Sequence, residues 1–449
     1  MESSEKFMRT IRVRNEQQLG TLGRLLVAVA DAGGDVGEVR LIQETSRYTL
    51  RDISIYTKDE SHMDYILRAM ESNPGTRVLA IRDEVLELHQ KGKIAIRSRL
   101  LVDSLSILRR VYTPGVAEVC LRIAKDPSLA RQYTAISHLV AIVTDGTAIL
   151  GLGDIGPVAG MPVMEGKAML METLVGLSGV PILLNSKEPD QIVETVTTIA
   201  PTFSAIQLED ISAPRCFEIE DRLQARLDIP VMHDDQHGTA VVVTAALTTA
   251  SRIIKVKLDK VLIGQIGLGA AGNAIGRMLM KLTGNPVLGA DLSESALAFF
   301  EQWGGKRSTL KEIMEECDVV VATTGAAGLI KPEMVRKGQI ILALSNPNPE
   351  IDPDVAINAG AAFAADGKSV NNVLGFPGIL RGAVDSYATH ISHEMYLAAA
   401  TAIADQTPHD ELVPNPLDKK VHQAVAQAVA QTAIQQGIAR AEFVPYVEE

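Results

Sequence analysis

The chain has 449 residues, of which 46% are hydrophobic and 22% charged, and its formal net charge is -12. A chain of this length and composition folds into two or three globular domains, which excludes an intrinsically disordered protein. Its acidic balance provides no basic surface for nucleic acid or an anionic membrane, so we expect neither among its partners.

The cysteines and the first residues favour the cytoplasm. Cys120, Cys216 and Cys317 are odd in number and outside any C-x-x-C pair, so we expect core thiols rather than disulfides or a thiolate metal site. The start, MESSEKFMRT, has no apolar segment of the signal-peptide kind, and no run of about 18 apolar residues follows. We therefore predict a cytoplasmic protein without a membrane span.

Residues 1–85 are expected to form a first domain. Strand-like and helix-like patterns follow one another as RTIRVRN, LGRLLVAVADAGG, VGEVRLI, YTLRDISIYT, MDYILRAME and TRVLAI. This β-α-β-β-α-β order predicts a ferredoxin-like α+β sandwich. With Leu19-Gly20 opening the first helix, the order resembles an ACT domain, which implies edge-to-edge pairing of copies and a small-molecule effector. A generic dimerising module of the same fold remains the alternative.

The segment RDEVLELHQKGKI is predicted to be a helical connector, and residues 86–236 are expected to form an α/β substrate domain. Its strand patterns HLVAIVTD, VPILLN, AIQLE and IPVMHDD alternate with helices from Glu165, from Asp190 and near Phe217. Such alternation predicts a mainly parallel sheet with ligands at the carboxyl ends of its strands. Residues 372–449 are Ala-rich and helical, and we expect them to return to this domain.

Two acidic pairs stand at predicted strand ends. Glu209-Asp210 follows AIQL, and Asp234-Asp235 follows IPVMH. Carboxylates that converge from separate strands form a hard-oxygen site suited to Mg²⁺ or Mn²⁺. Either pair considered alone favours a helix cap over a metal site. His233 and His237 flank the second pair, and a structural role is the simpler interpretation for both.

Residues 237–371 are expected to form a Rossmann-type domain. A predicted strand, Val261 to Ile266, runs into Gly267-x-Gly269-x-x-Gly272 and then an amphipathic helix, which is the context a dinucleotide requires. A second strand ends in Asp291, whose carboxylate is suited to the ribose hydroxyls. No Arg or Lys lies between Asp291 and Ala298 to meet a 2′-phosphate, which favours NAD over NADP.

Tyr112 before a Pro-Gly turn and Lys167 near a helix start favour structural roles when each is considered alone. The sequence, however, contains seven motifs in this order: VYTPGVAEVC, ILGLGDIGPVAGMPVMEGKAML, IQLEDISAPRCFEIE, VMHDDQHGTA, IGLGAAGNAIG, LALSNPNPEI and VNNVLGFPGILRGA. These seven ordered motifs, over about residues 100 to 400, resemble the malic enzyme family. The resemblance implies NAD-dependent oxidative decarboxylation of L-malate to pyruvate, with a divalent metal.

The resemblance also implies residue roles. Tyr112 is then the general acid and Lys167 the general base, with Asp234 orienting Lys167. Asn346 and Asn372 match positions that hold malate, although both also fit turn chemistry. The implied metal ligands are Glu209, Asp210 and Asp235. The implied cofactor-binding residues are Gly267, Gly269, Ala270, Ala271, Gly272, Asp291 and Asn346.

One position departs from the larger members of this family, which carry an Arg just before ILGLGD where this chain has Ala148. The chain therefore resembles the shorter bacterial type. Arg381 is a candidate for the missing carboxylate partner, and it fits a structural surface residue equally well. A malolactic enzyme and an NADP-preferring malic enzyme share the motifs, and a non-catalytic metabolite sensor is the more distant alternative. We expect a homodimer or a higher homo-oligomer.

Overall fold

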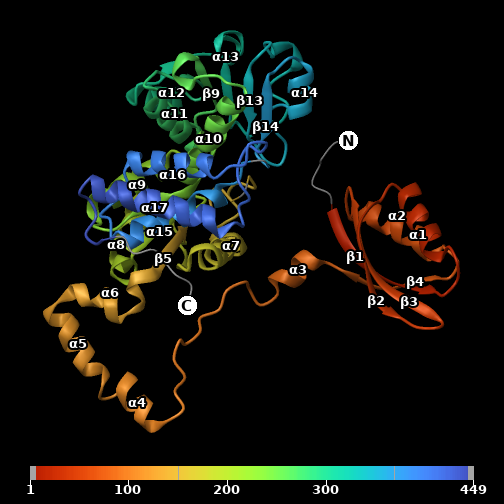
Figure 1. Ribbon diagram of the computed structural model, residues 1–449, viewed down its shortest axis with the longest axis horizontal. Coiled ribbons are helices and arrows are strands. Elements are labelled where there is room, and N and C mark those ends of the chain that lie inside the picture. The colour runs from red at the N-terminus through yellow and green to blue at the C-terminus, as the bar shows by residue number, and fades with distance from the viewer. Residues whose placement is uncertain (1–6, 150, 369, 443–449) are drawn as a thin grey trace. The chain divides into compact units, whose positions relative to one another are not determined.

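The computed structural model describes residues 7–149, 151–368 and 370–442. The chain divides into two compact units, Met1–Lys93 and Ile94–Glu449 (Figure 1). Residues 1–6 of the predicted first domain, Leu150 of the ILGLGD motif and residues 443–449 of the C-terminal region lie outside the described residues.

The first unit is a four-stranded antiparallel sheet, in the order β2-β3-β1-β4, with two helices packed on it. Alternate residues of β1 and β3, such as Ile11 and Ile53, meet Leu25 of α1 and Ile66 of α2 in one buried core. The predicted ferredoxin-like arrangement is confirmed. Its elements are β1 (Phe7–Glu16), α1 (Thr21–Asp31), β2 (Asp35–Glu44), β3 (Tyr48–Thr57), α2 (Glu60–Glu71) and β4 (Thr76–Arg82), followed by α3 (Glu84–His89).

The second unit begins with a segment of short helices that has little core of its own. None of the residues in α4 (Leu105–Val111), α5 (Val116–Lys125) and α6 (Ala130–Tyr133) is buried. We call residues 104–126 the arm. Cys120 lies on the arm and is exposed, so the expectation of a core thiol is wrong there, whereas Cys216 and Cys317 are buried as expected.

The base of the arm is attached to the body of the second unit through Arg131 of α6. Its guanidinium donates to the backbone oxygen of Val384 at 3.0 Å and lies 4.1 Å from the centre of the Tyr387 ring. Beyond this attachment, the chain enters β5.

The first sheet of the body has four parallel strands in the order β6-β5-β7-β8. Its strands are β5 (Leu139–Thr144), β6 (Ser178–Leu183), β7 (Ala205–Leu208) and β8 (Val231–His233), and its helices are α7 (Pro157–Val175), α8 (Pro189–Ile199) and α9 (Arg215–Arg226). Parallel strands place their carboxyl ends at one edge of the sheet, which is where ligands bind in such folds.

Helix α7 begins at Pro157 and not at Glu165 as the sequence pattern suggested. The added first turns contain Gly160 and Pro162, which have low helix propensity. Tertiary packing overrides this preference, because a side chain at residue 160 would come within 2.6 Å of Ile149. Pro157 at the first helical position suits the helix start.

The second sheet of the body has six parallel strands in the order β11-β10-β9-β12-β13-β14. Its strands are β9 (Ile263–Ile266), β10 (Leu288–Ala290), β11 (Lys306–Arg307), β12 (Val319–Ala322), β13 (Ile340–Ala343) and β14 (Phe363–Asp366). Its helices are α11 (Ala270–Thr283), α12 (Glu294–Gln302), α13 (Leu310–Glu316) and α14 (Pro353–Asn358). The predicted Rossmann-type sheet is confirmed, with its first strand two residues shorter at the start than the sequence pattern indicated.

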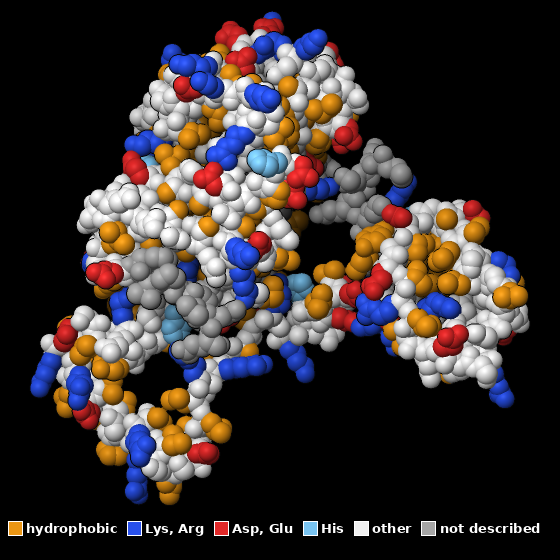
Figure 2. Space-filling view, viewed as in Figure 1, with side chains coloured by type: hydrophobic (Ala, Val, Ile, Leu, Met, Phe, Trp, Pro, Cys, Tyr) orange, Lys and Arg blue, Asp and Glu red, His pale blue; other side chains and the backbone are white. Residues whose placement is uncertain are grey.

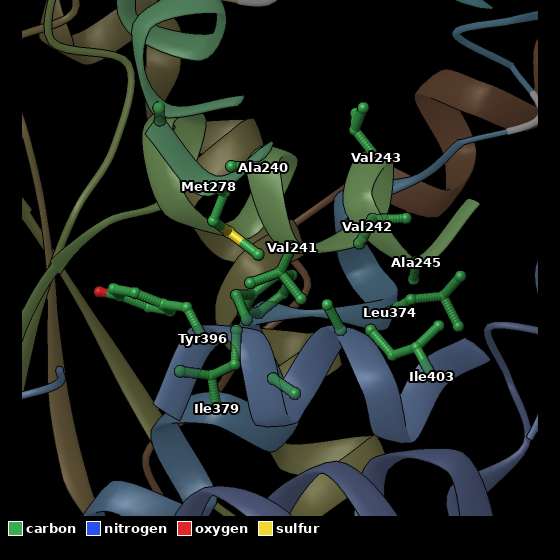
Figure 3. Packing of buried hydrophobic residues seen from close by; sticks show 14 of the residues in the cluster. Ala240, Val241, Val242, Val243, Ala245, Met278, Leu374, Ile379, Tyr396 and Ile403 are labelled. Atoms are coloured by element: carbon green, nitrogen blue, oxygen red, sulfur yellow. The ribbon is translucent and has the colours of Figure 1, made fainter. Parts of the chain in front are cut away.

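Helix α10 (Asp234–Ile253) links the two sheets and is buried on almost every side. Its Val241, Val242 and Val243 belong to one buried core with Met278 of α11 and with Ile379, Tyr396 and Ile403 of the C-terminal helices (Figure 3). These are α15 (Phe376–Asp385), α16 (His393–Asp405) and α17 (Lys419–Gln435), and α15 and α17 also contact α7. Within the described residues, no helix is both long enough and apolar enough to span a bilayer.

Candidate active site

The acidic pairs lie side by side at the carboxyl edge of the first sheet. β7 pairs with β8, and Glu209-Asp210 follows the first strand as Asp234-Asp235 follows the second. One carboxylate oxygen from each of Glu209, Asp210 and Asp235 lies within 4.8 Å of the others. The structure therefore brings together the three predicted metal ligands.

The donor set fits a hard divalent cation, since all three groups offer carboxylate oxygens. Burial raises the pKa of Glu209 well above its usual range; nearby Lys167 opposes this rise, and Asp234 and Asp235 add to it. A crowded group of buried carboxylates of this kind is stabilised by positive charge. The residues present thus match the group that the sequence motifs imply.

Backbone geometry holds the metal-ligand edge in place. Asp210 has a φ of 54°, in the left-handed region that non-glycine residues seldom occupy. Its N–H donates to Asp235 Oδ2 at 2.9 Å, and its carbonyl accepts from the N–H of Ala148 at 2.9 Å. Gln207 Nε2 donates to Glu209 Oε2 at 2.6 Å, which orients that carboxylate.

Lys167 points from α7 into the same cluster and is buried. Its Nζ pairs with Asp234, lies 3.1 Å from Glu209 Oε1 and lies 4.5 Å from the centre of the Phe376 ring. Burial alone would lower the pKa of Lys167, but Asp234 and Glu209 outweigh it and hold that pKa above its usual range. The positive charge of Lys167 thus partly balances the negative charges of Asp234 and Glu209.

Asp234 connects Lys167 with Asn372. Its Oδ2 accepts from Lys167 and also from Asn372 Nδ2 at 2.8 Å, so two separate predicted site residues meet on one oxygen. Gly238 provides room for this carboxylate, because a Cβ at that position would lie 1.9 Å from Asp234 Oδ1. Sequence reasoning missed Gly238, although a glycine in the first turns of a helix is itself a signal of close approach.

A second residue that sequence reasoning missed is Glu220 of α9. It is buried and accepts a hydrogen bond from the backbone of His233 and one from His237. The signal was an acidic residue on the apolar face of an amphipathic helix, between Ile219 and Leu223. The structural interpretation of His237 fits this contact.

The glycine-rich loop has the geometry that a dinucleotide needs. Gly267 has a φ of 85°, and a Cβ there would lie 2.6 Å from the backbone oxygen of Thr323. A Cβ at Gly272 would lie 1.8 Å from the Gly267 carbonyl, whereas Gly269 faces open space. Helix α11 begins at Ala270 without a side-chain cap, so its first N–H groups, including that of Ala271, are available for a pyrophosphate.

Asp291 lies beside this loop at the end of β10. Its Oδ2 accepts from the N–H of Leu268 at 2.7 Å and its Oδ1 from Ser293 at 2.8 Å. An ionised carboxylate has about four lone-pair sites, so both oxygens keep capacity for a ribose hydroxyl. The ribose-binding role of Asp291 stays a prediction.

Three other candidates are placed differently. Tyr112 lies on the arm and is 67% exposed; its backbone N–H donates to the carbonyl of Leu108, and its carbonyl accepts from the N–H of Val116. Asn346 is exposed after β13, and its backbone oxygen would lie 3.5 Å from a Cβ at Gly151. Arg381 forms a two-pronged pair with Asp385 on its own helix, which supports its structural interpretation.

Two family models match the chain. The one described as "Malic enzyme, N-terminal domain" matches residues 91–189 and 185–224, and the one described as "Malic enzyme, NAD binding domain" matches residues 355–438. These ranges contain Tyr112, Lys167 and Asn372.

Curated and solved relatives extend the similarity. NAD-dependent malic enzyme 1 of Bacillus subtilis (strain 168) is 54% identical over 433 residues, which are 96% of this chain and 99% of that protein. The NAD-dependent malic enzyme of Geobacillus stearothermophilus is 40% identical over 97% of this chain and 96% of its own. The crystal structure of malic enzyme from Pyrococcus horikoshii Ot3 matches with a TM-score of 0.76 at 39% identity, over 80% of this chain and 92% of that one.

Proposed function

The chain belongs to the malic enzyme family, and from that premise we propose that its Lys167 cluster performs oxidative decarboxylation of L-malate to pyruvate and CO₂ with reduction of NAD. The observation that carries the proposal is the convergence of Lys167, Asp234 and three carboxylates at one sheet edge. The glycine-rich loop of the same unit holds NAD.

Each chemical step has a residue suited to it. Lys167, when neutral, takes the proton of the malate C2 hydroxyl while a hydride passes from C2 to the nicotinamide. CO₂ then leaves from the carboxylate next to C3, and Tyr112 donates a proton to C3 of the resulting enolate to give pyruvate. Glu209, Asp210 and Asp235 would hold a divalent cation, whose positive charge would stabilise the enolate and lower the pKa of Lys167.

The asparagines orient the substrate in this proposal. Asn372 is already fixed on Asp234, and its remaining amide N–H and its oxygen would bind malate. Asn346, exposed after β13, would contact malate and the cofactor from the second sheet. We keep residues 86–236 with 372–449 as the substrate domain and residues 237–371 as the NAD domain.

One assay tests the function. Malate is supplied with NAD or NADP and with Mn²⁺ or Mg²⁺, and reduced cofactor, pyruvate and lactate are all measured. We expect reduced NAD and pyruvate in equal amounts. Lactate without net NADH would identify a malolactic enzyme, a higher kcat/KM with NADP would reverse the cofactor preference, and no turnover at all would leave the sensor alternative.

We further propose that the arm is an assembly surface of a homo-oligomer, and that Tyr112 reaches the Lys167 site of a second copy. The arm exposes large apolar side chains, among them Leu105 at 71% and Leu121 at 65% (Figure 2). Exposed apolar surface of this kind is typical of a protein interface. A second copy that covers the arm would withdraw Tyr112 from water. A general acid is most effective in such a water-excluded site.

A mixing experiment tests this arrangement. Tyr112→Phe and Lys167→Ala are each expected to be inactive, and after joint refolding the mixed oligomer contains one site with both native residues. We expect partial recovery of turnover in the mixture. Mixed oligomers without recovered activity would mean that Tyr112 serves its own chain.

A second function is favoured by a hollow in the first unit, between β1 and α1. It has a volume of about 310 Å³ and is lined by residues 15–23 together with Thr49 and Arg51. Arg51 Nη1 donates to Asn15 Oδ1 at 3.3 Å, and helix α1 begins after Gly20 without a side-chain cap. We propose that this ACT-like unit binds a small metabolite with a carboxylate group, such as an amino acid, as an effector.

Deletion of residues 1–85 tests the role of this unit. The truncated chain keeps both parallel sheets, so we expect it to fold, bind NAD and oxidise malate. The response to effectors, the oligomer mass, or both should change. A truncated enzyme with the parent's mass and the parent's response to every tested metabolite would exclude a regulatory or assembling role. The cytoplasmic location stays a prediction.

A further inference from the structure

Glu220 is a buried acceptor packed against the junction of β8 and α10. Its side chain is 4% exposed and accepts three hydrogen bonds. The donors are the backbone N–H of His233 at 2.8 Å, Gln236 Nε2 at 2.9 Å and His237 Nε2 at 3.0 Å. Because an ionised carboxylate only accepts, the Nε2 of His237 is the donor in this pair.

The other side chains of this same turn form the candidate active site. Asp234 accepts from Lys167 and Asn372, and Asp235 accepts from the backbone N–H of Asp210. One short stretch of chain is therefore bonded to α9 through its backbone and two side chains, and presents its two carboxylates to the cluster. A shift of this turn would move both carboxylates together.

Helix α10 has no cap of its own. Its N-cap residue, His233, makes no side-chain capping bond, so the first N–H groups of the helix need acceptors from elsewhere. Glu220 supplies one from a neighbouring helix, at the end of α10 where the helix dipole favours negative charge.

Packing alone does not account for an acid at this position. The neighbours of Glu220 on the same face of α9 are Cys216, Ile219 and Leu223, all buried. A carboxylate in such surroundings is costly unless its oxygens are bonded. All three of its bonds go to the turn that carries the metal ligand.

We propose that Glu220 is a positioning residue for the metal site, which touches neither substrate nor cofactor and acts through Asp234 and Asp235. The inference rests on the proposed function, because the carboxylate geometry matters only if a cation and Lys167 act there. Replacing a group that orients a metal ligand typically weakens metal binding about 10- to 100-fold.

Direct metal binding tests the proposal. Mn²⁺ is titrated calorimetrically into the full-length chain without NAD or malate, for wild type and Glu220→Gln. The variant keeps the side-chain volume, removes the charge and turns an amide N–H₂ towards existing donors. We expect the Kd for Mn²⁺ to rise about 10- to 100-fold, with an unchanged Kd for NAD and a kcat partly restored by excess Mn²⁺. An unchanged Kd for Mn²⁺ would overturn the proposal.

Glu350→Gln is the matched control. Glu350 is also fully buried, and it accepts from the N–H groups of Thr324 at 2.6 Å and Ser345 at 3.2 Å in the second sheet's loops. Its loss removes a buried charge of the same kind without touching the α10 turn. We expect its Kd for Mn²⁺ to equal that of wild type. Equal weakening in both variants would indicate general destabilisation and would overturn the proposal.

His237→Phe is a second variant for the case that Glu220→Gln fails to fold. The ring of His237 stacks on Tyr396 with centroids 4.5 Å apart, and Phe keeps this stacking while it removes one donor to Glu220. We expect a smaller but measurable rise in the Kd for Mn²⁺, and no change would overturn the proposal. A wild-type chain that neither binds Mn²⁺ nor reduces NAD with malate would instead contradict the proposed function.

Discussion

The Lys167 cluster and the arm hold their proposed catalytic groups in opposite ways. Lys167 is buried, pairs with Asp234 and Glu209, and lies over the Phe376 ring. Tyr112 is 67% exposed on helices without a single buried residue. The comparison teaches that the folding of one chain is enough to position the proposed base, whereas the proposed acid needs a further surface to be positioned against.

The difference has a physical cause. Charged groups withdrawn from water are stable only when they are paired, so the cluster has few geometries open to it. An exposed tyrosine on short helices has no such constraint and gains order only when apolar surface around it is buried. Changes in the cluster should therefore affect chemistry and local stability but not assembly, whereas changes in the arm should affect assembly and chemistry together.

The largest effect is expected for Lys167→Ala. Loss of the proton acceptor should lower kcat for malate oxidation by about 10²- to 10⁴-fold, the usual contribution of a general base. Calorimetric binding of NAD and the oligomer mass should stay as in wild type. The control is Lys187→Ala, which removes a lysine that is 54% exposed and paired with Asp154. Near-normal turnover of Lys167→Ala would contradict its role as base.

A charge on the arm is expected to have the next largest effect. Leu105→Asp should dissociate the oligomer and lower kcat by about 10²-fold, the low end of a general acid's contribution. Light scattering measures the mass in parallel with turnover. Leu417→Asp is the control, because Leu417 is similarly exposed at 67% but lies far along the chain from the arm. Full activity of a monomeric Leu105→Asp variant would remove the distinction between the two regions.

Gly238→Ala tests how tightly the cluster is packed. The added methyl would displace Asp234, and we expect about a 10- to 100-fold lower kcat together with a stability loss of about 1–3 kcal/mol. Gly23→Ala is the control, since a Cβ at that helical position meets nothing within 4 Å. It should leave thermal stability unchanged or slightly higher. If Gly238→Ala left kcat and stability unchanged, the Asp234 carboxylate would be able to shift without loss of function, and the tight packing inferred for the cluster would be wrong.

The smallest of these effects concerns the cofactor. Asp291→Ser removes a carboxylate that accepts from Leu268 and that would repel a 2′-phosphate. We expect kcat/KM with NAD to fall about tenfold, which corresponds to about 1.4 kcal/mol, and kcat/KM with NADP to rise. Steady-state kinetics with both cofactors measures the change. A wild-type enzyme that prefers NADP would show that Asp291 does not set the preference.

The sequence by itself determined the elements that follow local rules. The period of apolar residues predicted both parallel sheets and the ferredoxin-like unit. The rule that parallel strands end at one edge was enough to place Glu209 and Asp235 near each other. Gly267 and Asp291 were predicted as neighbours because the strand-turn-helix context imposes one geometry on a dinucleotide loop.

Only the tertiary structure decided the features that depend on packing between distant segments. The contact of Asn372 with Asp234, the room that Gly238 provides and the bonds from Glu220 each join residues from separate elements. No local periodicity encodes them, because the partner lies far along the chain. The exposure of Tyr112 was also decided at this level, because nothing in the described part of one chain covers it. The early start of α7 was decided by packing that overrides helix propensity.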